Sequence, residues 1–184
     1  MKVLGVVGSP RKKSNTDILI DEVLQGSKAA GAEFDKIFLN DLKIKPCQAE
    51  CSDYCKKIGY CKINDDMSPL YDKLFESDAI ILGTPVYWYG PSAQLKTFID
   101  RWYAFCHPKH VQKMKGKIFV LIAPLEETDK SAAQPLVNMI KKSLDYLDSK
   151  FHAKLIVSAG EKGEVKKNEQ AMKEAYKIGM KLKL

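Results

Sequence analysis

Short runs of apolar residues alternate along the chain with longer segments in which apolar positions recur at helical spacing. The short runs are rich in β-branched residues and predict five strands, at residues 3–8, 34–40, 79–87, 117–123 and 153–160. The longer segments predict helices at residues 15–30, 68–76, 92–104, 132–150 and from 166 onward. Strands that alternate with helices favour a parallel sheet covered on both faces, so the pattern predicts a doubly wound α/β fold.

The length and charge of the chain narrow the class of protein. We expect one domain over residues 1–184, because a chain of this size supports one sizeable core. No apolar run is long enough to span a membrane, and the first apolar run is too short for a signal peptide, so we expect a cytoplasmic protein without a membrane partner. The formal net charge is +7, but only Arg11 and Arg101 of the 30 basic residues are arginines, and the lysines are scattered. This favours a solvated lysine surface, or one that docks an acidic partner or anionic ligand, over nucleic-acid binding.

Four of the five cysteines lie in an insertion, at about residues 44–66, that follows the second predicted strand. Cys47, Cys51, Cys55 and Cys61 have the spacing C-x3-C-x3-C-x5-C. In a reducing cytosol, such thiols are more often ligands or redox groups than structural disulfides. Four thiolates match a [4Fe–4S] cluster or a zinc site, although zinc sites usually include a C-x2-C pair. The spacing is also compatible with a regulatory disulfide across one helical face, or with a remnant without function. The segment CHPKH (106–110) is interpreted as a loop rather than a second metal site.

The segment between the first predicted strand and helix, GSPRKKSNT (8–16), carries groups that suit a phosphate monoester. The amino terminus of a helix offers unpaired N–H groups and a partial positive charge. Short polar side chains and an arginine add hydrogen bonds and a full charge. The candidate residues are Ser9, Arg11, Ser14, Asn15 and Thr16. The segment has neither G-x-G-x-x-G nor G-K-[ST], which argues against a dinucleotide site and a P-loop. The alternative to phosphate binding is that Ser14 or Asn15 only caps the helix.

An aromatic segment, TPVYWYG (84–90), follows the third predicted strand and belongs to the same edge of the sheet. Its proline and glycine suit a rigid turn, and its aromatic side chains offer a flat apolar surface for a ring. Alternatively, the aromatic side chains pack beneath the following helix, but three consecutive residues cannot all face one core. A phosphate site beside a flat-ring site predicts FMN.

Two motifs resemble those of the NADPH-dependent FMN reductase family: GSPRxxSNT after the first strand, and GTPVYWYGPSAQLKTFIDRW at residues 83–102. The cysteine insertion, which ends in CxINDDM (61–67), is similar to that of the iron–sulfur flavoprotein branch of this family. The resemblance covers most of the chain, up to about Val157. It implies a flavodoxin-like fold with a five-stranded sheet of order 2-1-3-4-5, and a homodimer or homotetramer.

The resemblance also implies roles for residues of this chain. The five residues of the first loop would hold the FMN phosphate, and a third loop, 124–127, would approach the flavin ring with Leu125 and Glu126. The isoalloxazine would be cradled by Pro85, Val86, Tyr87, Trp88, Tyr89 and Gly90. In the iron–sulfur branch the cysteine spacing is C-x2-C-x2-C-x4–7-C and holds a [4Fe–4S] cluster. Here both short gaps are one residue longer, and the implied ligands are Cys47, Cys51, Cys55 and Cys61.

The expected function is electron transfer by a flavin-dependent oxidoreductase, from a ferredoxin-type donor or NAD(P)H to an acceptor, with a cluster beside the flavin. No side chain is predicted to act as a catalytic acid or base, because the flavin carries the chemistry. One alternative is a cluster-free NAD(P)H:FMN or quinone reductase. The chain could also be a flavodoxin-like electron carrier, against which its basic charge counts, or a zinc-stabilised binding module.

Overall fold

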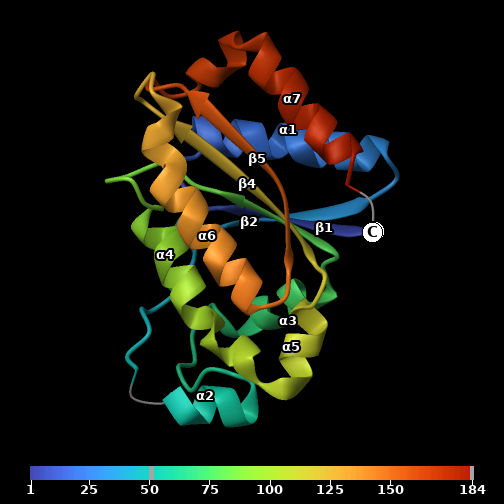
Figure 1. Cartoon of the computed structure of the whole chain (residues 1–184), viewed down its shortest axis with the longest axis vertical. Helices are drawn as coiled ribbons and strands as arrows, with labels where there is room; N and C mark the ends of the chain where they lie inside the picture. The colour runs from blue at the N-terminus through green and yellow to red at the C-terminus, as the bar shows by residue number, and fades with distance from the viewer. Residues whose placement is uncertain (50–51, 183–184) are drawn as a thin grey trace.

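Five parallel strands form a single sheet in the order β2-β1-β3-β4-β5, and the predicted flavodoxin-like topology is confirmed (Figure 1). The computed structural model describes residues 1–49 and 52–182. The chain leaves β1 toward β2 and then crosses to β3 on the other side, so the switch point, where ligands bind in such sheets, lies between β1 and β3. The strands are β1 (Lys2–Val7), β2 (Glu33–Phe38), β3 (Ala79–Gly83), β4 (Ile118–Leu125) and β5 (Lys150–Ser158).

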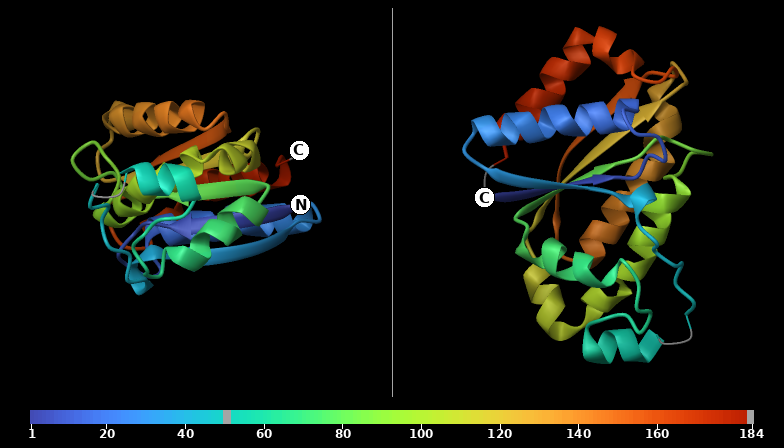
Figure 2. Two further views of the ribbon diagram at one scale, coloured as in Figure 1. Left: turned by 90° about the horizontal axis from the view of Figure 1, so that it is seen from below. Right: turned by 180° about the vertical axis from the view of Figure 1, so that it is seen from behind.

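Helices cover both faces of this sheet (Figures 1 and 2). One face is covered by α1 (Asn15–Ala29) and α7 (Glu169–Met180), and the other by α3 (Ser68–Glu76), α4 (Ala93–Asp100) and α6 (Gln134–Tyr146). Beyond α3 lie α5 (Pro108–Met114) and α2 (Ser52–Ile58), at the end of the molecule farthest from α7 (Figure 1). Short 3-10 helices occupy Leu39–Asp41, Arg101–Cys106, Lys130–Ala133 and Glu164–Lys167.

The core consists of two apolar layers, because successive side chains of a strand point to opposite faces of the sheet. In β3, Ile80 and Leu82 face the layer under α3, α4 and α6, whereas Ala79 and Ile81 face the layer under α1 and α7. The central strands β3 and β4 are buried along their whole length. Such continuous burial explains why their sequences are uninterrupted apolar runs.

Two glycines allow α1 and α7 to pack with their backbones in contact. A Cβ atom on Gly26 would lie 2.1 Å from the carbonyl oxygen of Tyr176, and one on Gly179 would lie 2.0 Å from that of Val23. Real Cβ contacts are never this short, so any larger residue forces the helices apart. This contact holds α7 against α1 on the sheet.

Several predicted element ends were wrong. The third strand ends at Gly83 rather than at residue 87, and the helix predicted over residues 92–104 becomes a 3-10 helix after Asp100. The helix predicted over residues 132–150 ends at Tyr146, and β5 already begins at Lys150. The CHPKH segment is not a loop, since Pro108 begins α5; proline suits the first turn of a helix because its missing N–H would have no partner there.

Candidate functional site

A cavity of about 120 Å³ opens at the carboxyl ends of the strands, at the edge of the sheet where the sequence predicts a ligand. We call it the strand-end cavity. It is lined by nine of the thirteen predicted FMN-binding residues: Arg11, Ser14, Asn15, Thr16, Pro85, Val86, Tyr87, Leu125 and Glu126. Pro124 of the third loop also lines it. Ser9, Trp88, Tyr89 and Gly90 lie outside its lining.

The first of its loops ends at the amino terminus of α1. Ser14 caps this helix, and its hydroxyl accepts a hydrogen bond from the backbone N–H of Asp17 at 3.3 Å. The first N–H groups of a helix have no partner within it, and no described residue accepts from the N–H groups of Asn15 or Thr16. Arg11 is exposed beside them, and its own N–H is held by the hydroxyl of Ser9 at 3.2 Å. These unused donors and the Arg11 charge suit a phosphate.

Asn15 has a second role that the sequence did not reveal. Its side-chain amide donates to the carbonyl oxygens of Ala159 and Glu161, at 3.0 and 2.9 Å, and its side-chain oxygen accepts from the N–H of Val165 at 3.2 Å. The amide therefore fastens the loop after β5 to the first loop. What Asn15 can still offer a ligand is its backbone N–H.

The loop after β5 supplies two cavity residues that sequence reasoning missed, Ala159 and Gly160. Neither carries a polar or aromatic side chain that would have indicated a site. The available signal was positional: this loop also follows the carboxyl end of a strand, so it belongs to the same edge of the sheet.

The aromatic segment forms a tight hairpin in which Tyr87 and Gly90 exchange two backbone hydrogen bonds of 2.9 Å. Its two central residues, Trp88 and Tyr89, have φ angles of 48° and 63°. Bulky residues rarely adopt this left-handed conformation, and each costs roughly 1–2 kcal/mol there. Trp88 is 96% exposed, so the hairpin holds an aromatic residue in solvent one position after Tyr87, which lines the cavity.

Ser92 ties the aromatic loop to the first loop. Its hydroxyl donates to the carbonyl oxygen of Gly8 at 2.6 Å, and its backbone N–H donates to the hydroxyl of Thr84 at 2.9 Å. The backbone N–H of Gly8 also donates to the carbonyl oxygen of Gly83 at 2.7 Å. The two loops are therefore fixed relative to each other before any ligand binds.

The cysteine insertion lies at the far end of the molecule, around α2, and forms a second site (Figure 1). Cys47, Cys55 and Cys61 line one cavity of about 350 Å³, which we call the cysteine cavity; Cys51 lies outside the described residues. Cys55 is buried in α2, whereas Cys47 precedes the helix, so these two do not share a helical face. Within the described ranges, no three His, Cys, Asp or Glu side chains form a ready metal-binding group.

A buried ion pair lies next to the cysteine cavity, which Arg101 helps to line. The guanidinium of Arg101 bonds the carboxylate of Asp65 at 2.7 and 3.1 Å, and their side chains are 0% and 4% exposed. Burial alone would raise the pKa of Asp65. Hydrogen bonds from Arg101 and from the N–H groups of Lys45 and Met67 outweigh that effect and hold this pKa below its ordinary value. Both groups therefore remain charged at neutral pH.

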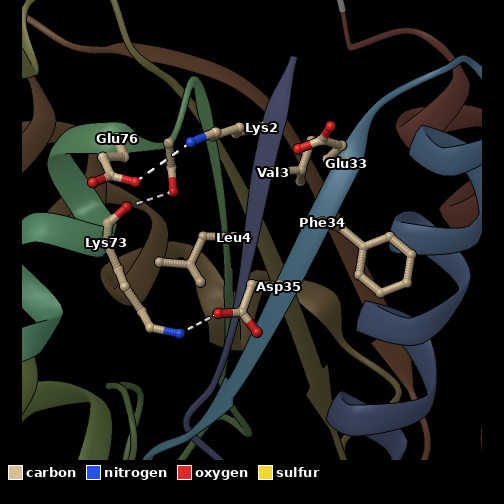
Figure 3. Close-up of a pocket in the computed structure, with 9 residues that line it drawn as sticks. Lys2, Val3, Leu4, Glu33, Phe34, Asp35, Lys73 and Glu76 are labelled. Atoms are coloured by element: carbon tan, nitrogen blue, oxygen red, sulfur yellow. Dashed lines mark hydrogen bonds and ion pairs between the residues drawn. The ribbon is translucent and has the colours of Figure 1, made fainter.

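A further cavity, of about 260 Å³, lies at the other end of β1 and β2 (Figure 3). Four of its five charged side chains form two pairs: Lys2 contacts Glu76 at 3.4 Å, and Lys73 contacts Asp35, while Glu33 belongs to neither pair. Both cations of this cavity are therefore paired with a carboxylate, and ligands of parallel sheets bind at the opposite edge. We assign this cavity no ligand.

The fold and the strand-end cavity define a flavodoxin-like protein of the flavin-dependent oxidoreductase class. The chain belongs to the NADPH-dependent FMN reductase family, whose model matches residues 1–180, so the resemblance in its motifs is confirmed. Among the described residues, no helix is long and apolar enough to cross a membrane.

The chain is also similar to individual proteins with assigned names. Over 182 residues the chain is 31% identical to an iron-sulfur flavoprotein of Archaeoglobus fulgidus, with 99% of this chain and 79% of the relative aligned. Over 101 residues it is 46% identical to an iron-sulfur flavoprotein of Methanocaldococcus jannaschii. This alignment covers 55% of this chain and only about half, 51%, of that relative. An NAD(P)H:quinone oxidoreductase from Methanothermobacter marburgensis has the same fold, with a TM-score of 0.78 at 17% identity over 100% of this chain and 99% of that chain.

Proposed function

We propose that the protein binds FMN in the strand-end cavity and passes electrons from NAD(P)H, or from a ferredoxin-type donor, to an acceptor. The observation that carries this proposal is that the first loop and the aromatic loop, fixed to each other by Ser92, line a single cavity. One loop offers the groups that a phosphate needs, and the other offers an apolar rim for a ring. The family description supports NADPH as a donor.

In this proposal each loop has a separate task. Arg11 and the free N–H groups at the start of α1 hold the FMN phosphate, with Ser9 and Ser14 fixing the loop that presents them. The aromatic loop, residues 85–90, supports the isoalloxazine, and Leu125 and Glu126 border its third side. When bound, FMN supplies the redox chemistry, and the protein supplies orientation and electrostatics.

The phosphate assignment is tested by comparing FMN with riboflavin, which lacks the phosphate. Arg11→Gln should weaken FMN binding about tenfold to a hundredfold, the worth of one hydrogen bond to a charged group, and leave riboflavin binding unchanged. Lys12→Gln is the matched control, because Lys12 is also exposed and cationic but pairs with Asp41 at 2.7 Å outside the cavity. Equal losses for both ligands, or for both variants, would show that Arg11 does not hold the phosphate.

The electron donor is tested on the FMN-loaded protein without oxygen. Loss of visible flavin absorbance after mixing with NADPH, NADH or a reduced ferredoxin identifies the donor directly. Reduction by a nucleotide, followed by steady turnover with an added quinone, supports a reductase. If neither nucleotide reduces the flavin, the NAD(P)H part of the proposal is wrong, and reduction by ferredoxin alone would leave the electron-transfer part.

We further propose that Cys47, Cys51, Cys55 and Cys61 hold a [4Fe–4S] cluster. The support is that the three described cysteines line one cavity, and that relatives are iron-sulfur flavoproteins by name. A cluster would add one-electron chemistry to the protein.

The cluster proposal is tested by metal and sulfide analysis of protein purified or reconstituted without oxygen. About four irons and four sulfides per chain are expected. Cys55→Ser should lose them, whereas Cys106→Ser, the matched control in the 3-10 helix 101–106, should keep them. One zinc without sulfide would indicate a zinc site instead, and no iron after reconstitution would refute the cluster.

A homodimer or homotetramer and a cytoplasmic location stay predictions. The exposed aromatic tip at Trp88 is the kind of surface that a second subunit covers. Light scattering of the purified protein would give the oligomeric state.

A further inference from the structure

The side chain of Asn15 lines the strand-end cavity, yet its hydrogen-bond donors are already in use. A side-chain amide nitrogen has two N–H donors, and that of Asn15 makes two hydrogen bonds, to the carbonyl oxygens of Ala159 and Glu161 at 3.0 and 2.9 Å. Its oxygen accepts from the backbone N–H of Val165 at 3.2 Å, and the residue is 4% exposed. A phosphate is held by donors and positive charge, so this side chain has nothing to offer it.

The three hydrogen bonds join the start of α1 to the loop after β5. The partners lie 144, 146 and 150 residues further along the chain. Ala159 directly follows β5, and Val165 lies in the 3-10 helix Glu164–Lys167. Both are buried, at 8% and 0% exposed. The Asn15 amide therefore holds the loop after β5 at both of its ends.

Ala159 extends this connection to the third loop of the cavity. Its carbonyl oxygen accepts from Asn15, while its backbone N–H donates to the carbonyl oxygen of Leu125 at 2.7 Å. The next residue, Gly160, lies against Glu126, since a Cβ atom on Gly160 would be 3.0 Å from Cγ of Glu126. All of these residues line the strand-end cavity. The Asn15 side chain thus fixes the wall that borders the flavin ring in the proposed function.

We propose that Asn15 is a positioning residue for the flavin ring: its side chain holds Ala159, and through it Leu125, in the place where they border the ring. This inference rests on the proposed FMN function. The backbone N–H of Asn15 stays with the phosphate site, so the residue serves the two ends of the ligand with different groups. An amide suits this task because it combines two donors with an acceptor.

Riboflavin separates a ring-positioning role from a phosphate-binding role, because it has the ring but lacks the phosphate. Asn15→Ala should weaken the binding of FMN and riboflavin by the same factor, about tenfold, which is the worth of about one net hydrogen bond. Arg11→Gln, in contrast, should weaken FMN binding alone. Quenching of flavin fluorescence gives both dissociation constants. A loss confined to FMN would overturn the proposal, and so would unchanged binding of both flavins.

Asn168→Ala is the matched control. Asn168 also lies at the start of a helix, where its side-chain oxygen accepts from the backbone N–H of Ala171 at 3.0 Å, but it does not line the cavity. The control should lose stability and keep the dissociation constants of both flavins. Equal losses of flavin binding in Asn15→Ala and Asn168→Ala would show a general effect of destabilisation and refute the positioning role.

A measurement on the FMN-loaded wild type decides the question even where Asn15→Ala does not fold. In isotope-labelled protein, NMR should detect a scalar coupling through the hydrogen bond from Nδ2 of Asn15 to the carbonyl carbon of Ala159. The same nitrogen should show no coupling to the phosphorus of bound FMN. A coupling between Nδ2 and phosphorus, or loss of the coupling to Ala159, would overturn the proposal.

Failure of the proposed function looks different, because the wild type would then bind neither flavin. A wild type that binds FMN but not riboflavin would overturn the positioning role alone, since the wall held by Asn15 is in place without a phosphate.

Discussion

The Arg101–Asp65 pair supports a stability prediction that needs no cofactor. Asp65→Asn removes one charge and leaves Arg101 buried without its counter-ion. Breaking a buried ion pair from one side costs about 3–5 kcal/mol, because the remaining charge stays desolvated. The Arg101–Asp65 pair counts as a buried ion pair, since its side chains are 0% and 4% exposed and its N–O contacts are 2.7 and 3.1 Å long.

Asp66→Asn is the matched control, because the neighbouring Asp66 has the same chemistry in an exposed position. Its carboxylate accepts from the backbone N–H of Lys43 at 2.7 Å, and it has no buried cation as a partner among the described residues. Losing one such hydrogen bond costs about 0.5–1.5 kcal/mol. Urea unfolding, followed by the fluorescence of the buried Trp102, measures both variants. A cost of Asp65→Asn within about 1 kcal/mol of the control would refute the reasoning.

The pH dependence provides an independent check of this pair. Because the pKa of Asp65 is lower in the folded protein than its ordinary value of 3.8, its ionised form stabilises the fold above about pH 4. That stability is lost as the pH falls through the folded pKa. The free-energy difference between wild type and Asp65→Asn should therefore be full above about pH 4 and shrink below it. A difference that does not change between about pH 7 and about pH 3 would contradict this assignment.

Three further predictions follow from single positions. Gly179→Ala should destabilise the protein by about 1–3 kcal/mol and lower its melting temperature, because the new Cβ would lie 2.0 Å from the oxygen of Val23; an unchanged melting temperature would mean that α1 and α7 pack less closely. Trp88→Asn should raise the free energy of unfolding, measured by urea titration, by about 1 kcal/mol, because asparagine tolerates the φ of 48° far better than tryptophan. A loss of stability would show that the exposed ring is needed for folding. Burial, together with nearby cations, lowers the pKa of His110 below its ordinary 6.5, so stability should fall as the pH drops below about 6.5. His110→Phe should flatten that dependence, and equal slopes in both proteins would refute it.

The strands β1, β3 and β4 could be predicted because they are buried along all or nearly all of their length, which produces uninterrupted apolar runs in the sequence. The end of β3 was misjudged for a physical reason: Thr84 and Val86 still donate hydrogen bonds to the carbonyl oxygens of Ile122 and Pro124 on β4, at 2.9 and 3.1 Å. The residues after Gly83 therefore keep a strand-like composition although Pro85, which lies between them, has no N–H for the ladder. Apolar spacing also cannot distinguish an α-helix from the 3-10 helix that follows Asp100, because both bury one side.

Most of the candidate site could be predicted because loops at adjacent strand ends share one edge of the sheet. Ala159 and Gly160 could not, since their contribution is backbone and shape. The task of Asn15 was equally hidden: its hydrogen bonds to Ala159 and Glu161 span 144 and 146 residues. A polar residue before a helix predicts a cap or a ligand contact. Only the fold shows that this amide fastens one loop to another.

The role of Arg101 was hidden in the same way, yet the composition contained a signal for it. In a chain with 30 basic residues, an arginine is the exception, and Arg101 stands within a strongly apolar helical stretch. A lysine at that position could not hold the carbonyl oxygens of Lys45 and Ile63 and both oxygens of Asp65 at once, because an ammonium group has three donors and no planar fork. Where lysine is the default cation, a buried arginine indicates that several acceptors need a donor set of fixed geometry. Here those acceptors lie on both sides of the cysteines in the sequence, so the Arg101 side chain holds the two ends of the insertion at a fixed separation.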